Sequence, residues 1–378
     1  MKLFGKRKHN KRTEFIPEQY LLPTTYSGSY KQLGDNVFLP WDLGTNGNVL
    51  VFGSAGSGRR CSYIEPNIRN TDHRSNCIVY INKTEAKSII EHVTDRTILE
   101  LDLSTHPIDY FSLITDKSDA ERFVDKMFEA HESIFQEPSD GFYFDHERKI
   151  LVDIVTSVLD HKETCNYQTI LKILCEDTET WSETFRSLPD NIQESIICDL
   201  QIRIRDLAPD DAISLPDVIA DIMHKPNTVL FVEHNGSEKT VYESVFLNEF
   251  VYRYKRRIDS DAVMTKVLMA DAKDCFYDAN LFCKEVRQIG MSIDFIYPSI
   301  AELQEQHPVC YQMIANNSAA IVYLVPTDNE TMEFCTDLIG HGRKHMIDFH
   351  SLPAEYEIVL CPVLCKDPFV AKKIGTDI

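Results

Sequence analysis

Short runs of apolar and β-branched residues recur along the chain, and polar or mixed segments separate them. Eight such runs predict β-strands, at about 48–53, 77–82, 97–103, 228–234, 266–271, 292–297, 319–325 and 357–361. Several of them, such as Thr228–Val232 and Ala320–Leu324, are apolar at nearly every position. Continuous apolarity is typical of strands that are covered on both faces, as in a parallel sheet.

Helical patterns lie between several of these strands, including about 242–257, 276–289 and 328–339. The alternation of strands and helices predicts an α/β fold with a mostly parallel sheet flanked by helices. From about 118 to 223 no strand run appears, and the patterns are amphipathic, as in the segment 146–159. This region predicts an all-helical insertion.

Length and composition favour an ordinary globular protein, since 378 residues with 43% hydrophobic and 26% charged residues suffice for a large domain and an inserted one. No apolar run approaches the roughly 20 residues needed to cross a bilayer, and the N-terminus lacks the apolar region of a secretory signal. The eleven cysteines are an odd number without a framework spacing, which favours reduced thiols. We therefore expect a cytoplasmic protein without a transmembrane segment.

The formal net charge of −20 opposes nonspecific attraction to the DNA backbone. Positive charge is concentrated near the N-terminus, at Lys2, Lys6, Arg7, Lys8, Lys11 and Arg12. We interpret residues 1–20 as a basic, flexible terminus. Contact of this cluster with the inner face of the cell membrane, or with nucleic acid, is the alternative.

The first predicted strand leads into a glycine-rich turn, Gly53-Ser54-Ala55-Gly56-Ser57-Gly58, with the spacing of G-x-x-x-x-G-K-[ST]. Such a turn before a helix binds phosphate, because backbone N–H groups point inward and the helix dipole adds positive potential. Where lysine and a small hydroxyl should follow, the chain has Arg59 and Arg60. The lysine would contact the β- and γ-phosphates and the hydroxyl would hold Mg²⁺, so the turn indicates P-loop ancestry without indicating hydrolysis.

A second signal is an apolar strand that ends in a carboxylate, Lys266-Val-Leu-Met-Ala-Asp271. In P-loop ATPases such an aspartate supports Mg²⁺, and an adjacent glutamate commonly polarises the attacking water. The next residue here is Ala272, whose methyl group cannot accept a proton. Because P-loop chemistry requires the two strand ends to converge, we expect strand 266–271 to lie next to the strand that ends at Gly53.

The order of further motifs resembles that of the cytosolic ATPase domain of type IV secretion coupling proteins, the TraG/VirD class of conjugative DNA transfer. The similarity runs from about Asn48 to Leu338 and is interrupted mainly in the helical insertion. The matching segments are Glu65-Pro-Asn67, Ile81-Asn-Lys-Thr-Glu85 (the family has Asp-Pro-Lys-Gly-Glu), Tyr110–Leu113, Thr228–Asn235, Asp271, Arg287–Gly290, Ser292–Ser299, Met313–Asn317 and Ala320–Leu324. Their collinear order, rather than any single match, carries the resemblance.

The departures from the family pattern fall on the chemistry. Arg59 and Arg60 replace its Walker A lysine and hydroxyl, Ala272 replaces its Walker B glutamate, and Pro298 replaces its strand-end glutamine. The family's membrane-spanning N-terminus is also missing from this sequence. The resemblance therefore implies a degenerate paralogue, with a P-loop NTPase-like domain at 21–117 and 224–378 and the helical insertion at 118–223.

The function implied is a coupling-protein-like component of a conjugative or type IV secretion system that acts by protein interaction rather than by hydrolysis. Its expected partners are secretion or conjugation proteins, including a homologous coupling ATPase, a relaxase and DNA, and further copies of itself. The candidate ligands are ATP, ADP or a phosphate-like anion, without Mg²⁺; we assign no catalytic residue and no metal ligand. The alternatives are a working ATPase that uses Arg59 with a relocated acid such as Asp274, and an anion- or DNA-contacting adaptor.

Other constellations favour structural roles. His341, His345 and His350 precede Cys361 and Cys365, but the spacing fits no common zinc finger. Aromatic residues at helical spacing predict a core face, and basic residues at the end of the same helix suit its dipole. The residues of these last two groups are Tyr242, Phe246, Phe250 and Tyr254, and the run Arg253–Arg257.

Overall fold

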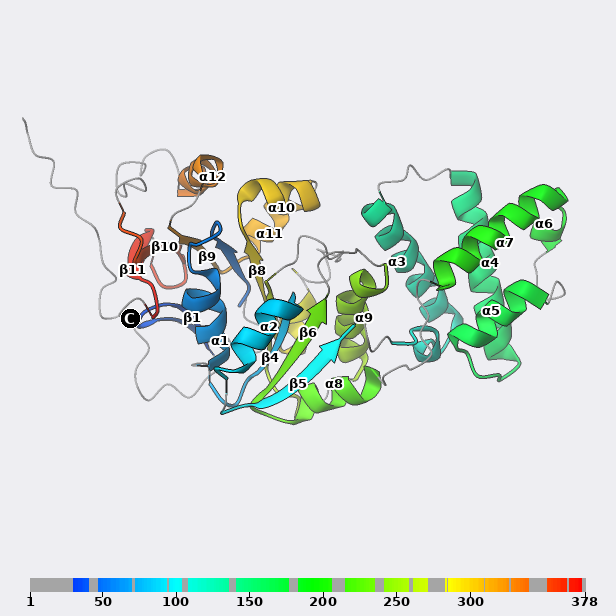
Figure 1. Ribbon diagram of the computed structural model, residues 1–378, viewed down its shortest axis with the longest axis horizontal. Coiled ribbons are helices and arrows are strands. Elements are labelled where there is room, and N and C mark those ends of the chain that lie inside the picture. Colours follow the sequence, from blue (N-terminus) through cyan, green and yellow to red (C-terminus); the bar gives the residue numbers. More distant parts are fainter. Residues whose placement is uncertain are drawn as a thin grey trace, which may run out of the picture.

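The computed structural model describes residues 30–40, 47–69, 72–93, 95–103, 108–135, 141–176, 183–205, 215–234, 241–257, 261–270, 283, 285–308, 310–325, 328–339, 352–365 and 367–375. These residues form a nine-stranded sheet, a separate two-stranded hairpin, and helices that pack on the sheet or extend from it (Figure 1). The strands are β1 (Tyr30–Gly34), β2 (Val37–Pro40), β3 (Val49–Phe52), β4 (Asn76–Asn82), β5 (Thr97–Asp102), β6 (Thr228–His234), β7 (Thr265–Met269), β8 (Met291–Tyr297), β9 (Ala320–Leu324), β10 (Tyr356–Leu360) and β11 (Phe369–Lys372).

From β3 to β10 the helices alternate with the strands, except in one long helical stretch between β5 and β6. They are η2 (Arg59–Ile64), α1 (Glu65–Arg69), α2 (Lys83–Ile90), η3 (Phe111–Leu113), α3 (Lys117–Phe135), α4 (Gly141–Asp160), α5 (Tyr167–Glu176), α6 (Glu183–Arg186), α7 (Asp190–Arg205), α8 (Leu215–His224), α9 (Val241–Arg257), η6 (Val286–Ile289), α10 (Ile300–Gln306), α11 (Tyr311–Asn316) and α12 (Asn329–Ile339).

The large sheet has the order β11-β10-β9-β3-β8-β7-β4-β6-β5. The strands from β9 to β5 are parallel, and β10 and β11 add an antiparallel edge. All eight strands expected from the apolar runs are present, and the prediction of a mostly parallel α/β fold is confirmed. Because the strands are parallel, the carboxyl ends of β3, β7 and β8 meet at one edge of the sheet.

The predicted neighbour of the first sheet strand is wrong. β7 does not lie next to β3, because β8 pairs with both of them: Asp294 is opposite Val49 on one side and Leu268 on the other. Every residue of β8 is buried, which suits a place in the middle of the sheet. The ends of β3 and β7 still converge on one pocket, but across an intervening strand.

The two faces of the sheet carry separate cores. Alternate residues of a strand point to opposite faces, so Val49 and Val51 join one core and Leu50 and Phe52 the other. The Val49 face is covered by η2, α1, α2 and the β1–β2 hairpin, and the Leu50 face by helices that include α9 and α10. The core of the Leu50 face continues without a break into the long helical stretch.

Between residues 117 and 224, the described residues form helices and their connections, without a strand. In Figure 1, α4 to α7 form the end of the molecule farthest from β11. α3 packs against α9, and α8 packs against both α9 and β6, so these two helices contact the sheet part of the molecule directly. The division into domains at 118 and 223 stays a prediction.

Three strands, β1, β2 and β11, were not predicted from the sequence. Lys31 and Gln32 interrupt the apolar pattern of β1, although both are buried, and β2 and β11 contain only four residues each. Asn36, with φ of 58°, makes the tight turn between β1 and β2. The predicted helix at 276–289 lies mostly outside the described residues, and its end, 286–289, is a 3-10 turn.

Candidate anion-binding site

The glycine-rich turn follows β3 at the carboxyl edge of the sheet. The Gly53 N–H donates to the carbonyl of Tyr297 at 3.1 Å, which extends the ladder between β3 and β8 by one residue. The chain then turns back, with the Ser57 N–H donating to the carbonyl of Ser54 at 3.0 Å. The sequence of a buried strand followed by small residues therefore produces the tight loop that its glycine spacing predicts.

Two of the glycines are required by the shape of this loop. A Cβ on Gly53 would overlap the Ser57 hydroxyl and lie 3.0 Å from the Leu324 side chain, so only glycine fits there. Gly58 has φ of 93°, in the left-handed region that glycine adopts without strain. Its carbonyl accepts from the Ser62 N–H at 2.7 Å and so begins the following helix.

That helix begins with a π-helical segment, η2, and continues directly as α1. The N–H of Glu65 donates to the carbonyl of Arg60, five residues earlier, which is the hydrogen bond that defines a π-turn. Such turns are uncommon and are often found at functional sites. Arg59 and Arg60 are the first two residues of this segment.

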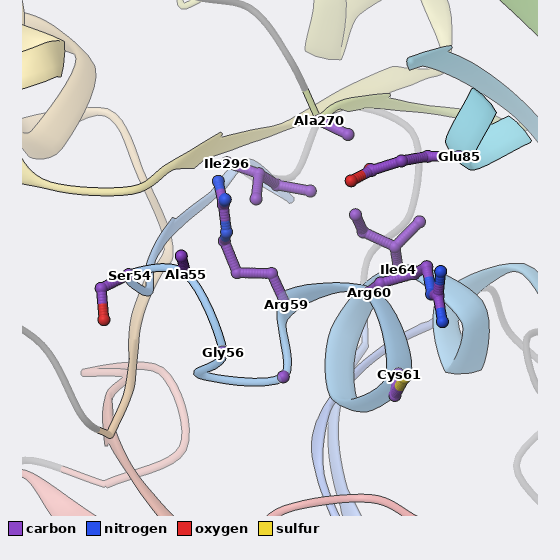
Figure 2. Close-up of a pocket in the computed structure, with 11 residues that line it drawn as sticks. Ser54, Ala55, Gly56, Arg59, Arg60, Cys61, Ile64, Glu85, Ala270 and Ile296 are labelled. Carbon is purple, nitrogen blue, oxygen red and sulfur yellow. The ribbon is translucent and has the colours of Figure 1, made fainter. Parts of the chain in front are cut away.

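A pocket of about 500 Å³ lies beside the loop (Figure 2). Its walls come from the loop, from the start of the helix, and from the strand ends that converge there. The lining residues are Ser54, Ala55, Gly56, Gly58, Arg59, Arg60, Cys61, Ile64, Glu85, Ala270 and Ile296. Thus five of the predicted site residues, Ser54, Gly56, Gly58, Arg59 and Arg60, line one cavity, while Gly53 and Ser57 shape the loop behind it.

Arg59 and Arg60 take different directions. In Figure 2 the Arg59 side chain extends across the pocket toward Ile296, while Arg60 lies beyond Ile64, beside the helix. Arg60 forms an ion pair with Glu65, with Nε and Oε1 3.3 Å apart. Among the described residues, the Arg59 guanidinium takes part in no hydrogen bond or ion pair. The pocket therefore contains one cationic group that is available to an anion.

Glu85 is a pocket residue that sequence analysis quoted only as the end of a motif. It lies in the first turn of α2, whose N-cap Asn82 accepts a hydrogen bond from the Thr84 N–H at 3.0 Å. Because α2 directly follows β4, Glu85 stands at the same sheet edge as the loop, and Figure 2 shows its carboxylate directed into the pocket. Its position after a buried parallel strand was the signal that could have identified it.

Two features of the site bear on which ligands it can hold. The glycines that let backbone N–H groups face a phosphate are present, but the position of the metal-binding hydroxyl holds Arg60, a cation. Across the described residues, no three His, Cys, Asp or Glu side chains gather so as to hold a metal ion. Asp271, Ala272 and Asp274 lie outside the described residues; Pro298 directly follows β8.

A buried polar network supports the helix that follows the loop. The Lys31 ammonium of β1 forms an ion pair with Asp294 of β8, and both side chains are fully buried. The Tyr63 hydroxyl donates to the second oxygen of Asp294 at 3.0 Å. Asn67 in α1 bonds to both backbone groups of Gln32, accepting at 2.9 Å and donating at 2.7 Å. These contacts fix η2 and α1 between the hairpin and the sheet.

The remaining motifs are an aromatic helix face, a basic run and a group of histidines. Phe246, Phe250 and Tyr254 are buried in the core, as predicted; the side chain of Tyr242 is not among those described. Arg253 is mostly buried and pairs with Asp119 at 2.7 Å. His341, His345 and His350 lie outside the described residues. No described helix has the length and apolarity that crossing a membrane requires.

Comparison with known proteins shows a likeness in structure but not in sequence. No protein-family model matches the chain, and no curated protein matches it. Among solved structures, the bacterial conjugative coupling protein TrwBdeltaN70 superposes with a TM-score of 0.66 at 11% identity, over 93% of this chain and 89% of that one. Plasmid coupling protein TrwB in complex with the ATP analogue ADPNP gives 0.67 at 11% identity, over 96% and 93%.

VirB4 of Thermoanaerobacter pseudethanolicus is also similar, with a TM-score of 0.60 at 11% identity over 94% of this chain and 98% of that one. At this level of identity the likeness establishes the fold and not the activity. The chain has the fold of the coupling protein TrwB and of VirB4, as its motif order predicts. The likeness extends over nearly the whole of both chains.

Proposed function

We propose that this protein is a coupling-protein-like component of a conjugative DNA-transfer or type IV secretion system. Its degenerate nucleotide site binds a phosphate-type anion without Mg²⁺ and does not hydrolyse nucleotide. The proposal is supported by a fold that matches 89% of the solved chain of TrwBdeltaN70 and 98% of that of VirB4. It is also supported by a loop that keeps the phosphate-binding backbone while its side chains depart from those of an ATPase.

The observation that carries the proposal is the direction of Arg59. It extends into the pocket without a partner among the described residues, at the start of a helix whose dipole already favours negative charge. A guanidinium can bind two oxygens of a phosphate at once, whereas an ammonium acts as a point charge. TrwB, whose fold this chain shares, has been solved in complex with sulphate and in complex with ADP and Mg²⁺.

Hydrolysis requires groups that this chain lacks. Arg60 repels Mg²⁺ and offers no hydroxyl, and it turns instead toward Glu65. Ala272 cannot act as a general base at the position where the family has glutamate. General-base and metal-ion contributions commonly amount to orders of magnitude each, so losing both leaves little rate. The protein then acts through binding to other components, with the anion holding the loop in one conformation.

Isothermal titration with tripolyphosphate, ATP and Mg-ATP tests the site. We expect the wild type to bind tripolyphosphate and ATP, and added Mg²⁺ not to tighten binding. Arg59→Ala should weaken binding by about tenfold or more, as expected when a charged hydrogen bond is lost. Arg69→Ala is the matched control, because Arg69 is exposed on the same continuous helix and does not line the pocket. Binding that requires Mg²⁺, or that survives Arg59→Ala unchanged, would contradict the proposal.

Steady-state phosphate release separates this function from the rival, a working ATPase that uses Arg59 with Asp274. Turnover should be undetectable in the wild type. A rate near ~1 s⁻¹, at the low end of ordinary enzymes, that vanishes in Arg59→Ala would establish the ATPase instead. Arg59→Lys/Arg60→Thr restores the Walker A side chains; because Ala272 remains, we expect it to recover Mg²⁺-dependent binding but not turnover.

The assignment to a transfer system is tested in the host cell. Deleting the gene should lower the frequency of DNA transfer or of secretion, and the wild-type gene should restore it. Arg59→Ala should restore it less well than Arg69→Ala does. An unchanged transfer frequency after deletion would reject the assignment and leave the binding result standing.

A further inference from the structure

A buried lysine from the far end of the chain contacts the glycine-rich loop. Lys373 directly follows β11, and its side chain is almost fully buried. Its ammonium donates to the carbonyl of Ser57 at 2.7 Å and also to the carbonyl of Val325, just after β9. The two antiparallel steps from β9 to β10 and β11 make β11 run parallel to β3, so that it ends at the edge where the loop lies.

The backbone of this lysine is itself held in place. The Lys373 N–H donates to the carbonyl of Glu355 at 2.8 Å, across the β10–β11 ladder. On the other side, Asp35 at the tip of the β1–β2 hairpin donates its N–H to the carbonyl of Lys372 at 2.8 Å. The ammonium therefore reaches the loop from a rigid support, rather than from a loosely held terminus.

The contact with Ser57 determines where the next amide points. A trans peptide is planar, with its C=O and N–H directed to opposite sides. Since the Ser57 carbonyl is directed to Lys373, the N–H of Gly58 is directed the other way, and Gly58 lines the pocket. Within the described residues, that N–H takes part in no hydrogen bond of the protein. It remains available to a ligand.

We propose that Lys373 is a positioning residue that orients the Gly58 amide toward the anion bound in the Arg59 pocket. This inference rests on the proposed function of the loop. It gives a role in the site to a lysine that follows the last described strand, in a loop that lacks the Walker A lysine. Lys373 acts through the loop backbone, and Arg59 contacts the anion directly.

The energetic cost of burying this ammonium supports a specific role. An ammonium taken out of water without full compensation costs several kcal/mol, and an apolar side chain would fill the same place more cheaply. Burial lowers the pKa of Lys373, which Glu357 and Glu355 partly offset. Glu357 is fully buried, and neither of its carboxyl oxygens has a hydrogen-bond partner among the described residues. Buried ionisable groups whose pKa is shifted by burial and by nearby charges are more often found at functional sites than elsewhere.

The test observes the Ser57–Gly58 peptide directly by NMR. Labelling with [1-¹³C]serine and [¹⁵N]glycine selects Ser–Gly amides, and the chain contains only Ser27–Gly28 and Ser57–Gly58. Ser57→Ala assigns the signal by removing it. In Lys373→Met we expect the Ser57 carbonyl and Gly58 amide signals to shift or broaden. The matched control, Lys372→Met, removes a neighbouring cation and should leave both signals in place.

Titration with inorganic phosphate completes the test. Phosphate should shift the Gly58 amide in the wild type, and its affinity should fall about tenfold or more in Lys373→Met, the size expected for the loss of a charged hydrogen bond. If the wild type binds phosphate, and Lys373→Met binds it with the same affinity and shows the same NMR signals, this inference is wrong. The proposed function is then unaffected. If the wild type binds no phosphate, the proposed function is wrong. The Gly58 signal in Lys373→Met then still shows whether Lys373 orients the loop.

Discussion

At the scale of single residues, the fully buried Lys31–Asp294 pair makes the support of the candidate site sensitive to one carboxylate. Asp294→Asn leaves the Lys31 ammonium buried opposite a neutral amide. Because an unpaired buried charge is costly, we expect the free energy of unfolding to fall by about 3–5 kcal/mol. Urea denaturation followed by circular dichroism measures this loss. The double variant Lys31→Met/Asp294→Leu removes both charges and should recover most of the lost stability. If Asp294→Asn unfolds within about 1 kcal/mol of the wild type, the contribution of a surface ion pair, the buried pair contributes little to stability.

The neighbouring Lys266 gives the fold a pH dependence of its own. Its ammonium donates to the carbonyl of Asn67 at 3.0 Å, and burial lowers its pKa to about 8. Between that value and the ordinary 10.5, the unfolded chain holds a proton that the folded protein has released. Stability contributed by this group therefore rises as the pH increases from about 8 to 10.5, and below that window the penalty is fully present.

Lys266→Met removes this penalty. We expect the variant to be at least as stable as the wild type at neutral pH, and to show a smaller rise in stability between about pH 8 and 10.5. The urea midpoints of the two proteins are measured across that pH range. Subtracting one profile from the other removes the contribution of the titrating groups that both proteins share. Parallel pH profiles of the two proteins would contradict the assignment.

At the scale of elements, buried ion pairs join the first long helix of the helical stretch to α9. Asp119 in α3 accepts from Arg253 at 2.7 Å, and Glu249 in α9 accepts from Arg122 of α3 at 2.6 Å. The carboxylates of Asp119 and Glu249 are fully buried. Burial alone would raise the pKa of Asp119, but Arg253 and then Arg122 hold it below its ordinary value of 3.8.

Asp119→Asn should therefore loosen α3 from α9. We expect a loss of about 3–5 kcal/mol, together with faster amide hydrogen exchange in α3 than in the strands of the sheet. In the wild type the stabilisation by Asp119 is present above about pH 4 and is lost as the pH falls below its folded pKa, whereas the variant lacks this acid-sensitive term. Hydrogen exchange followed by mass spectrometry resolves the two regions, and uniform acceleration across both would argue against a local attachment.

The elements divide sharply into those that sequence could predict and those that it could not. Continuous apolar runs predicted the strands of the parallel sheet, because both faces of these strands are covered. The sequence of β1 lacks such a run, because it contains Lys31, whose ionic partner Asp294 lies on β8, 263 residues away. The same holds for Lys373 and its contact with Ser57, at a separation of 316 residues. The glycine loop is local and was predicted, whereas the position of β7 one strand away from β3 depends on pairing that local pattern does not encode.

At the scale of the whole molecule, the two ends of the described chain meet behind one loop. The β1–β2 hairpin bonds to β11, and the residue after β11 bonds to the glycine-rich turn. The hairpin also bonds, through Gln32, to the helix that follows the turn. The β1–β2 hairpin and β11, which do not belong to the parallel part of the sheet, thus support the candidate site from two sides. These segments from the two ends of the described chain therefore contribute to the geometry of the site.

The net charge of −20 argues against an adaptor that contacts DNA on its own and for a component that binds other proteins. A chain of this charge is repelled by the DNA backbone at long range, and Arg59 offers a phosphate only one local attraction. We expect no binding of a bare 30-base-pair duplex at 150 mM salt, with a Kd weaker than roughly 100 µM, the weak end of nonspecific binding. Fluorescence anisotropy measures this, with Arg59→Ala as the control for binding through the pocket. Tight binding that falls steeply as salt increases, and that persists in Arg59→Ala, would place a cationic DNA surface elsewhere on the chain and favour the adaptor.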